Sequence, residues 1–148
     1  MRANCRFAMA VHVLAVLAYK ADGSATSHLL AASVNTNPVV IRRLLLALQS
    51  ARLVETRKGA GFGSRLTRPP GQINLAEVYR AVEALDPFVM PPRKPNAACP
   101  VGQCIQTALE QVFTSAEAAM LRDLGRTNLA QILASVKSMP GCRTRIGK

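Results

Sequence analysis

The feature that most constrains the fold is the segment from Ser27 to Arg68, in which two short helix-like stretches flank a tight turn. In that turn Asn37 fits a helix N-cap, and Pro38 fits the first helical position, where a backbone N–H has no intrahelical partner to lose. Apolar residues then recur at the spacing of one helix face: Ile41, Leu44, Leu45 and Leu48. The pattern predicts a helix-turn-helix whose second helix buries this face.

A hairpin is predicted directly after the second helix. Residues 53–58 and 64–68 read as its two arms, and the glycine-rich residues 59–63 between them supply backbone freedom at the tip. Two helices followed by such a hairpin outline a winged helix-turn-helix, with the wing at 55–68. The expected fold class is therefore mainly α with a small β-hairpin wing.

The remainder of the chain divides into a scaffold, a connection and a second helical region. Apolar periodicity predicts helices at 4–20, 74–84 and 127–136, and a long helix at 103–124 that is broken near Thr114-Ser115. Five prolines between Asp86 and Pro100 predict an extended connection. We expect a DNA-binding domain at 1–85, a Pro-rich connection and possible sensor loop at 86–102, a dimerisation region at 103–136 and a flexible basic tail at 137–148.

Positive charge is concentrated on the segment that carries this pattern. Residues 1–68 hold ten Lys or Arg against two acidic residues, a net charge of +8, whereas the rest holds nine against six, a net charge of +3. Because Lys and Arg near phosphates release condensed counterions, the distribution favours a polyanionic partner. Tryptophan is absent and aromatic residues make up 4%, which disfavours the stacking used on single strands and leaves double-stranded DNA as the expected partner.

Several side chains are candidates for contact with DNA. The recognition helix of such a domain enters the major groove, where the guanidinium of Arg42 or Arg43 could hold a guanine through two hydrogen bonds. The alternative is that both arginines contact only phosphate, and that Asn37 is only a helix cap. The full set of candidates is Arg6, Thr36, Asn37, Val39, Val40, Arg42, Arg43, Arg57, Lys58, Arg65 and Arg68.

Four cysteines are expected to be reduced in a cytoplasmic chain. Cys99 and Cys104 lie together at the end of the Pro-rich connection and are candidates for a redox sensor, in which oxidation of Cys99 and a bond to Cys104 or to a partner's cysteine shifts the dimer helix. The alternative is that Cys99 is a small buried hydrophobe and Cys104 a helix-surface residue. No metal site is predicted, because a closed zinc site needs four ligands.

Four segments together resemble the Rrf-two (Rrf2) family of bacterial transcription regulators: NTNPVVIRRLLLALQSARLV, the glycine-rich hairpin, INLAEVYRAVE and CPVGQCIQ. The resemblance covers residues 1 to about 135. It implies a homodimer whose long C-terminal helices cross, with the recognition helix at 38–50. Cluster-binding members carry three cysteines in this region, whereas this chain has two, so an iron-sulfur cluster is disfavoured and no cofactor is expected.

The expected function is a homodimeric DNA-binding transcription regulator, a repressor rather than an activator, on a palindromic operator. An iron-sulfur-sensing regulator and a non-transcriptional basic module that binds RNA or an acidic protein remain alternatives. Enzyme activity is not expected, because no phosphate loop, paired carboxylates or Cys-His arrangement is visible. His12 and Lys20 interrupt the apolar N-terminal segment, which predicts a buried helix of a cytoplasmic protein without a membrane partner.

Overall fold

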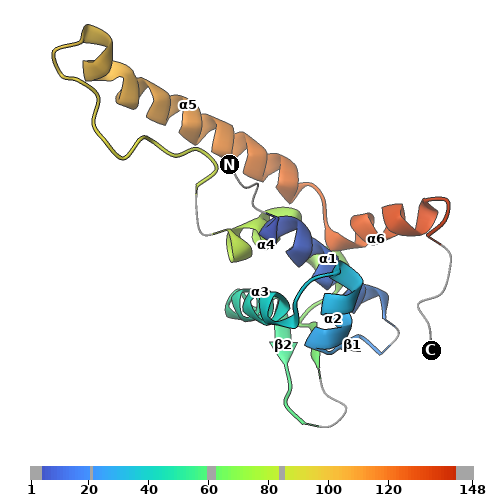
Figure 1. Cartoon of the computed structure of the whole chain (residues 1–148). Helices are drawn as coiled ribbons and strands as arrows, with labels where there is room; N and C mark the ends of the chain where they lie inside the picture. The colour runs from blue at the N-terminus through green and yellow to red at the C-terminus, as the bar shows by residue number, and fades with distance from the viewer. Residues whose placement is uncertain (1–4, 21, 60–62, 84–85, 143–148) are drawn as a thin grey trace.

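The computed structural model describes residues 5–20, 22–59, 63–83 and 86–142. A compact body of short helices and a small sheet forms one end of the molecule, and a long helix projects from it (Figure 1). Helix α1 (Arg6–Tyr19) runs through the body and buries Ala10, Val13, Leu14 and Leu17. Around it lie α2 (Ser27–Val34), α3 (Pro38–Ser50) and α4 (Leu75–Val82). The predicted buried first helix is confirmed.

The helix-turn-helix consists of α2 and α3, and each helix starts at a side-chain cap. The Thr26 hydroxyl accepts a hydrogen bond from the Leu29 N–H (3.2 Å), and the Asn37 carbonyl oxygen accepts one from the Val39 N–H (2.8 Å). Between the helices Asn35 adopts a left-handed conformation (φ 59°), which Asn tolerates better than most residues. The predicted inward face of α3 is confirmed, since Ile41, Leu44, Leu45 and Leu48 are all buried.

The wing belongs to a sheet of three antiparallel strands. Strands β2 (Val54–Thr56) and β3 (Ser64–Leu66) form the predicted hairpin, and β1 (Ser24–Ala25) pairs with the other edge of β3. Strand β1 was not predicted, because two residues carry no periodic pattern. Gly63 lies against it: a Cβ there would come 2.4 Å from the Ala25 carbonyl oxygen. The glycine is therefore needed for close packing; residues 60–62 of the predicted tip lie outside the described residues.

Helix α4 follows a short 3-10 turn (Pro70–Gln72). It begins with a capping box, in which Asn74 and Glu77 each bond the other's backbone N–H (3.0 and 3.1 Å). The helix ends at Val82, slightly before the predicted end near residue 84. Residues 86–99 form the predicted extended connection without helix or strand.

The long helix α5 (Pro100–Gly125) is continuous. The predicted break near Thr114-Ser115 is wrong, because one polar pair does not interrupt a helix whose neighbours all favour it. The predicted start at residue 103 is also too late: Pro100 occupies the first helical position, so the connection ends at residue 99 rather than 102. Among its 26 residues none is buried.

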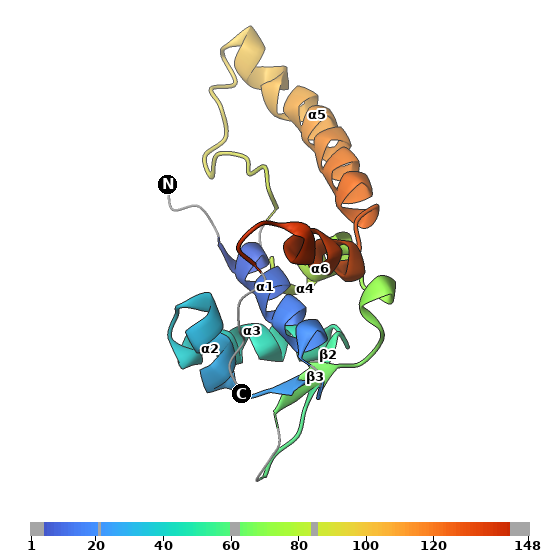
Figure 2. The ribbon, with the colours of Figure 1, turned by 90° about the vertical axis from the view of Figure 1, so that its right-hand side faces the viewer.

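The last helix, α6 (Leu129–Ser138), returns to the body and lies beside α1 (Figure 2). Leu129 is fully buried in the main core. Two backbone hydrogen bonds of 2.9 Å join its start to the start of α4: Leu75 N–H to the Thr127 carbonyl, and Leu129 N–H to the Ile73 carbonyl. The region predicted as 103–136 is thus two units, and α6 continues two residues into the predicted tail.

Candidate nucleic-acid interface

Helix α3 exposes a face that carries both polar and apolar side chains, and this face lies opposite its buried face. Val39, the adjacent pair Arg42 and Arg43, Leu46 and Gln49 are exposed about one helical turn apart, which places them along one side of the helix. Two of these exposed residues are apolar: Val39 is 47% exposed and Leu46 is 65% exposed. An exposed apolar side chain beside arginines suits a surface that meets thymine methyl groups as well as guanine.

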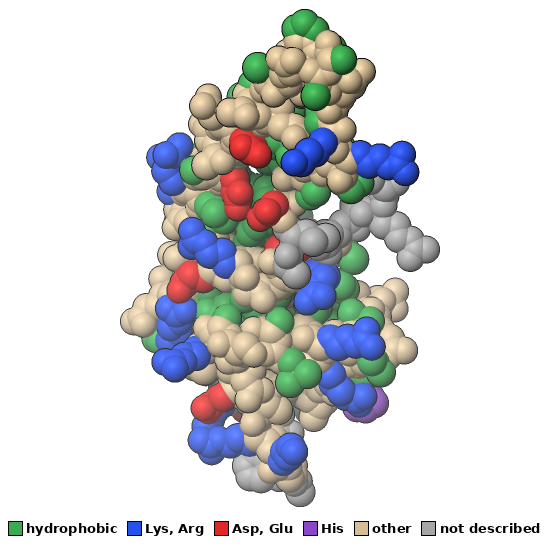
Figure 3. All heavy atoms as spheres, turned by 90° about the vertical axis from the view of Figure 1, so that its left-hand side faces the viewer, with side chains coloured by type: hydrophobic (Ala, Val, Ile, Leu, Met, Phe, Trp, Pro, Cys, Tyr) green, Lys and Arg blue, Asp and Glu red, His purple; other side chains and the backbone are tan. Residues whose placement is uncertain are grey.

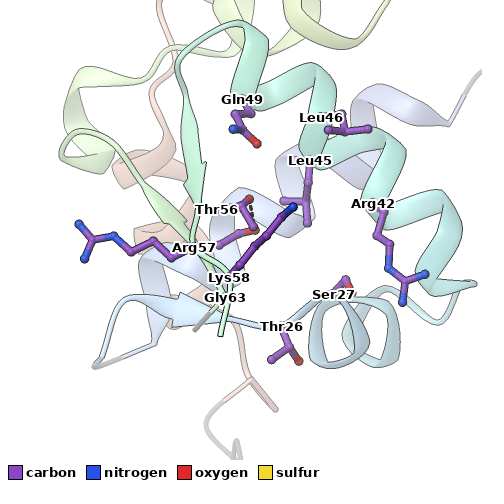
Figure 4. A pocket seen from close by; sticks show the side chains of 11 residues that line it. Thr26, Ser27, Arg42, Leu45, Leu46, Gln49, Thr56, Arg57, Lys58 and Gly63 are labelled. Atoms are coloured by element: carbon purple, nitrogen blue, oxygen red, sulfur yellow. Dashed lines mark hydrogen bonds between the residues drawn. The ribbon is translucent and has the colours of Figure 1, made fainter. Parts of the chain in front are cut away.

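A groove of about 570 Å³ separates this helix from the wing. Figure 4 shows α3 on one side of it, the wing residues Thr56 to Lys58 on the other, and the start of α2 at its end. Lys58 points toward α3, whereas Arg57 points away from the groove along the opposite side of the wing. Both arms of a reading head, a helix and a wing, thus place cations on the same concave surface. The residues that line the groove are Thr26, Ser27, Arg42, Leu45, Leu46, Gln49, Thr56, Arg57, Lys58, Gly63 and Ser64.

Among the described residues, the lining contains three basic side chains and no acidic one. In the space-filling view, Lys and Arg side chains are spread over both halves of this face, whereas several acidic side chains gather together above its middle, away from the wing (Figure 3). A narrow concave surface of one charge sign concentrates its potential. The groove is therefore suited to a polyanion.

Arg42 has a neighbour that the sequence did not reveal. Its Nη2 lies 3.4 Å from Nε2 of His28, which comes from α2 fourteen residues earlier. Because guanidinium nitrogens only donate, His28 accepts this hydrogen bond through an unprotonated Nε2. The first helix of the motif thereby orients a candidate base-contacting residue of the second.

Glu55 organises the basic side chains of the wing. Arg65 Nε donates to its carboxylate at 2.5 Å, and Arg57 Nη2 lies 3.8 Å away. The hydrogen bond and the charge of Arg65 hold the pKa of Glu55 below its usual value. Arg65 lies on β3 directly opposite Glu55, so its charge is largely paired within the wing, and Arg57 and Lys58 remain the more accessible of the wing cations.

Arg68 connects the base of the wing to α4. Its guanidinium donates to the Gln72 carbonyl (3.1 Å) and to the Glu77 carboxylate (2.8 Å). Burial raises the pKa of Glu77, but the hydrogen bonds from Arg68 and from the Asn74 backbone outweigh it, and the net shift is downward. Arg68 was predicted as a DNA contact, and the structure gives it internal partners that fix the wing on the body.

The remaining predicted contacts are not all brought to the groove. Arg6 lies at the end of α1 where Phe7 contacts Tyr79 and Glu83 of the α4 segment, away from the wing. Val40 is half-buried against the core. Thr36 is half-buried in the turn, and the Asn37 carbonyl oxygen is used as a cap. The groove lining thus includes Arg42, Lys58 and Arg57, with the Arg57 side chain turned to the opposite side of the wing, and Val39 and Arg43 lie on the adjoining exposed face of α3.

Sequence reasoning missed Thr26, Ser27, Leu46, Gln49 and Thr56, all of which line the groove. One signal was available: Leu46 breaks the apolar pattern of α3 because it falls on the exposed face. Thr26 and Ser27 carried no such signal. They reach the groove only because α2 packs across the start of α3.

The cysteines lie apart from this groove, and all four are exposed. The alternative in which Cys99 is a buried hydrophobe is wrong, because Cys99 is exposed at the residue just before α5. Its segment is nevertheless ordered by close contacts: Gln103 donates to the Ala97 carbonyl (2.7 Å), and a Cβ on Gly102 would come 2.3 Å from the Asn96 carbonyl oxygen. Within the described residues no three His, Cys, Asp or Glu side chains converge to hold a metal.

Comparison with known proteins decides the family. The family model described as an iron-dependent transcriptional regulator, Rrf2, matches residues 3–135. The protein belongs to the Rrf2 family. It is 38% identical over 130 residues to YwnA of Bacillus subtilis, assigned as an HTH-type transcriptional regulator, and the match covers 88% of this chain and 96% of YwnA.

Solved structures agree with the fold. A crystal structure described as a DNA-binding protein shares 38% identity and a TM-score of 0.70, covering 86% of this chain and 98% of its own. The global cysteine regulator CymR of Bacillus subtilis shares the fold at 19% identity and a TM-score of 0.59, over 91% of this chain and 98% of its own. The Rrf2 member described here is thus a DNA-binding transcription regulator with a winged-helix fold. No helix within the described residues is long and apolar enough to cross a membrane.

Proposed function

We propose that this Rrf2 protein is a cytoplasmic homodimer that represses transcription by binding a palindromic operator. The observation that carries the proposal is the groove between α3 and the wing, whose charged lining residues are Arg42, Arg57 and Lys58. In a winged helix of this kind α3 enters the major groove and the wing follows the adjacent backbone or minor groove. Bound there, the protein would obstruct the polymerase.

The exposed face of α5 supports the dimer. Its apolar positions form a stripe along one side of the helix, and two of the most open, Val101 and Val112, are 66% and 60% exposed. A long helix with such a stripe and no buried residue is expected to pack against another copy. Ala108 on the same side is also exposed, whereas Phe113 is half-buried and stacks on Phe88 of the connection (ring centroids 5.0 Å apart). The other half-buried members of this side are Ile105, Leu109, Ala116 and Met120.

The dimer can be tested at α5. Val112→Asp places a charge on the stripe, and we expect sedimentation to show a shift from dimer to monomer with helical content retained. Thr107→Asp is the matched control, because five helical residues rotate it about 140° from Val112. Dimers that persist in Val112→Asp would contradict the role of this face.

We propose that thiol oxidation regulates the DNA binding of this protein and that no bound cofactor takes part. A peroxide would convert the Cys99 thiol to a sulfenic acid and release water. The thiol of Cys104, or of a partner's cysteine, would then form the disulfide and release a second water. Both cysteines are exposed. Because Cys104 lies more than one helical turn beyond the cap, a bond within one chain requires the first turn of α5 to unwind, and this change would reach the dimer helix.

One experiment separates these proposals. Anaerobically purified protein is bound to DNA fragments spanning its own promoter at fixed salt, before and after peroxide, while its absorption spectrum is recorded. Selective binding lost on oxidation by a colourless protein supports the thiol-controlled repressor. Visible absorption would instead indicate an iron-sulfur cluster. Selective binding indifferent to peroxide would overturn thiol control, and equal binding to random duplex or to RNA would overturn the operator proposal.

A further inference from the structure

A second groove, of about 440 Å³, lies between α1, the end of α2 and α6. It shares no lining residue with the groove between α3 and the wing. Its walls are mainly apolar and come from two helices: Val11, Ala15 and Val16 of α1, and Ile132, Leu133 and Val136 of α6. This volume and this lining fall within the range of small-molecule sites.

Polar groups sit at defined places along this groove. His12 Nε2 and Ser33 Oγ form a hydrogen bond with each other (3.0 Å). An apolar ligand beside them therefore does not have to supply a hydrogen-bond partner. Tyr19 lines the other end of the groove, seven residues after His12 along α1 and therefore about 10 Å from it. Lys137 Nζ lies 5.6 Å from the centre of the Tyr19 ring. Lys137 is not a lining residue itself, but its contact with Tyr19 places a cation beside one end of the mainly apolar groove.

The charge of the surrounding helices has one sign. The chain contains eight acidic residues, yet α1, α2 and α6 contain none. Their charged residues are Arg6 and Lys137. An anion at the Lys137 end thus meets no carboxylate from any of the three helices that form the groove, whereas a cation would be repelled by Lys137.

We propose that this groove binds a small apolar carboxylic acid as its anion. The carboxylate lies near Lys137 and Tyr19, and the hydrocarbon part runs along α1 and α6 toward His12. Such a ligand buries apolar surface on both sides while its charge stays at the exposed end. The site goes beyond the DNA-binding function. It joins α6, which follows the long helix α5, to α1 and to α2, the first helix of the helix-turn-helix.

Cys142 provides the test, because it lines this groove while the other three cysteines do not. Full-length reduced protein is treated with iodoacetamide in the presence of octanoate, and alkylation of each cysteine is followed by mass spectrometry. We expect octanoate to slow alkylation of Cys142 several-fold and to leave Cys5, Cys99 and Cys104 unchanged. Equal rates at Cys142 with and without octanoate would overturn the proposal, as would equal slowing at all four cysteines.

Variants locate the ligand within the groove. Val136→Asp puts a negative charge in its wall and should abolish octanoate binding in calorimetry, whereas Ala134→Asp, an exposed α6 position outside the lining, should not. Lys137→Gln should weaken octanoate about two- to five-fold, as expected for a solvent-exposed ion pair, and leave octanol binding unchanged. Equal loss of binding in Ala134→Asp would show that octanoate does not bind in this groove. Protection of Cys142 at high protein concentration without octanoate would likewise contradict a ligand site there.

Discussion

Helices α3 and α5 differ in what fixes them. Helix α3 has a capped start and a fully buried face, and its exposed face points at the groove beside the wing. Helix α5 is twice as long, yet none of its residues is buried, and it meets the body mainly at its C-terminal end, where Gly125 approaches Ala76. The reading head is thus organised within one chain, whereas the long helix keeps apolar side chains such as Val101 and Val112 exposed even though its own connection covers Phe113.

The largest expected effect comes from truncating matched apolar residues on the two helices. Leu48→Ala removes a side chain that is 0% exposed and should cost about 2–5 kcal/mol of unfolding free energy. Val112→Ala on α5 should change the stability of the dilute monomer by less than about 0.5 kcal/mol. Urea unfolding at low protein concentration measures both. Equal losses would break the comparison between the two helices.

The next effect concerns DNA discrimination. Arg42→Ala should cost about 1–3 kcal/mol of preference for the operator over random duplex, because a bidentate base contact is lost. Arg57→Ala should weaken both DNAs alike and reduce the salt slope by about 1. Titrations at several salt concentrations, with each variant on each DNA, separate the two roles. Equal losses on both DNAs for Arg42→Ala would assign Arg42 to phosphate contact.

A smaller effect is expected at the start of α3. Asn37→Ala removes the cap of Val39 and should cost about 1 kcal/mol of stability. Asn37→Ser keeps a capping oxygen and should retain both stability and operator affinity. Thermal unfolding and operator binding of the two variants are the measurements. Normal stability with lost affinity in Asn37→Ser would show that Asn37 contacts DNA directly.

The smallest effect is a pH dependence at the base of the wing. Because the folded state lowers the pKa of Glu77, its stabilising contribution is present above the unfolded value of about 4.3 and is lost as pH falls through the folded pKa. Glu77→Gln should therefore cost under about 1 kcal/mol at pH 7, and this cost should shrink in acid. Arg68→Met should follow the same pH dependence in urea unfolding; a different one would mean that their ion pair is not the cause.

Local signals predicted much of the reading head. The cap at Asn37, the buried face of α3 and the two arms of the wing follow from short-range spacing and turn chemistry. The cations Arg42, Arg57 and Lys58 were also identified, because they flank recognisable elements. Strand β1 was missed, since it exists only through pairing with β3 some forty residues later.

The sequence by itself determined which segments are helical, which face of α3 is buried and which segment carries the positive charge, because these properties depend on neighbours within a turn or two. Only the tertiary structure decided which side chains meet. It placed His28 beside Arg42, paired Glu77 with Arg68, and packed α6 against α1. Such contacts join residues far apart in sequence through packing of whole elements, and no local pattern encodes the partner.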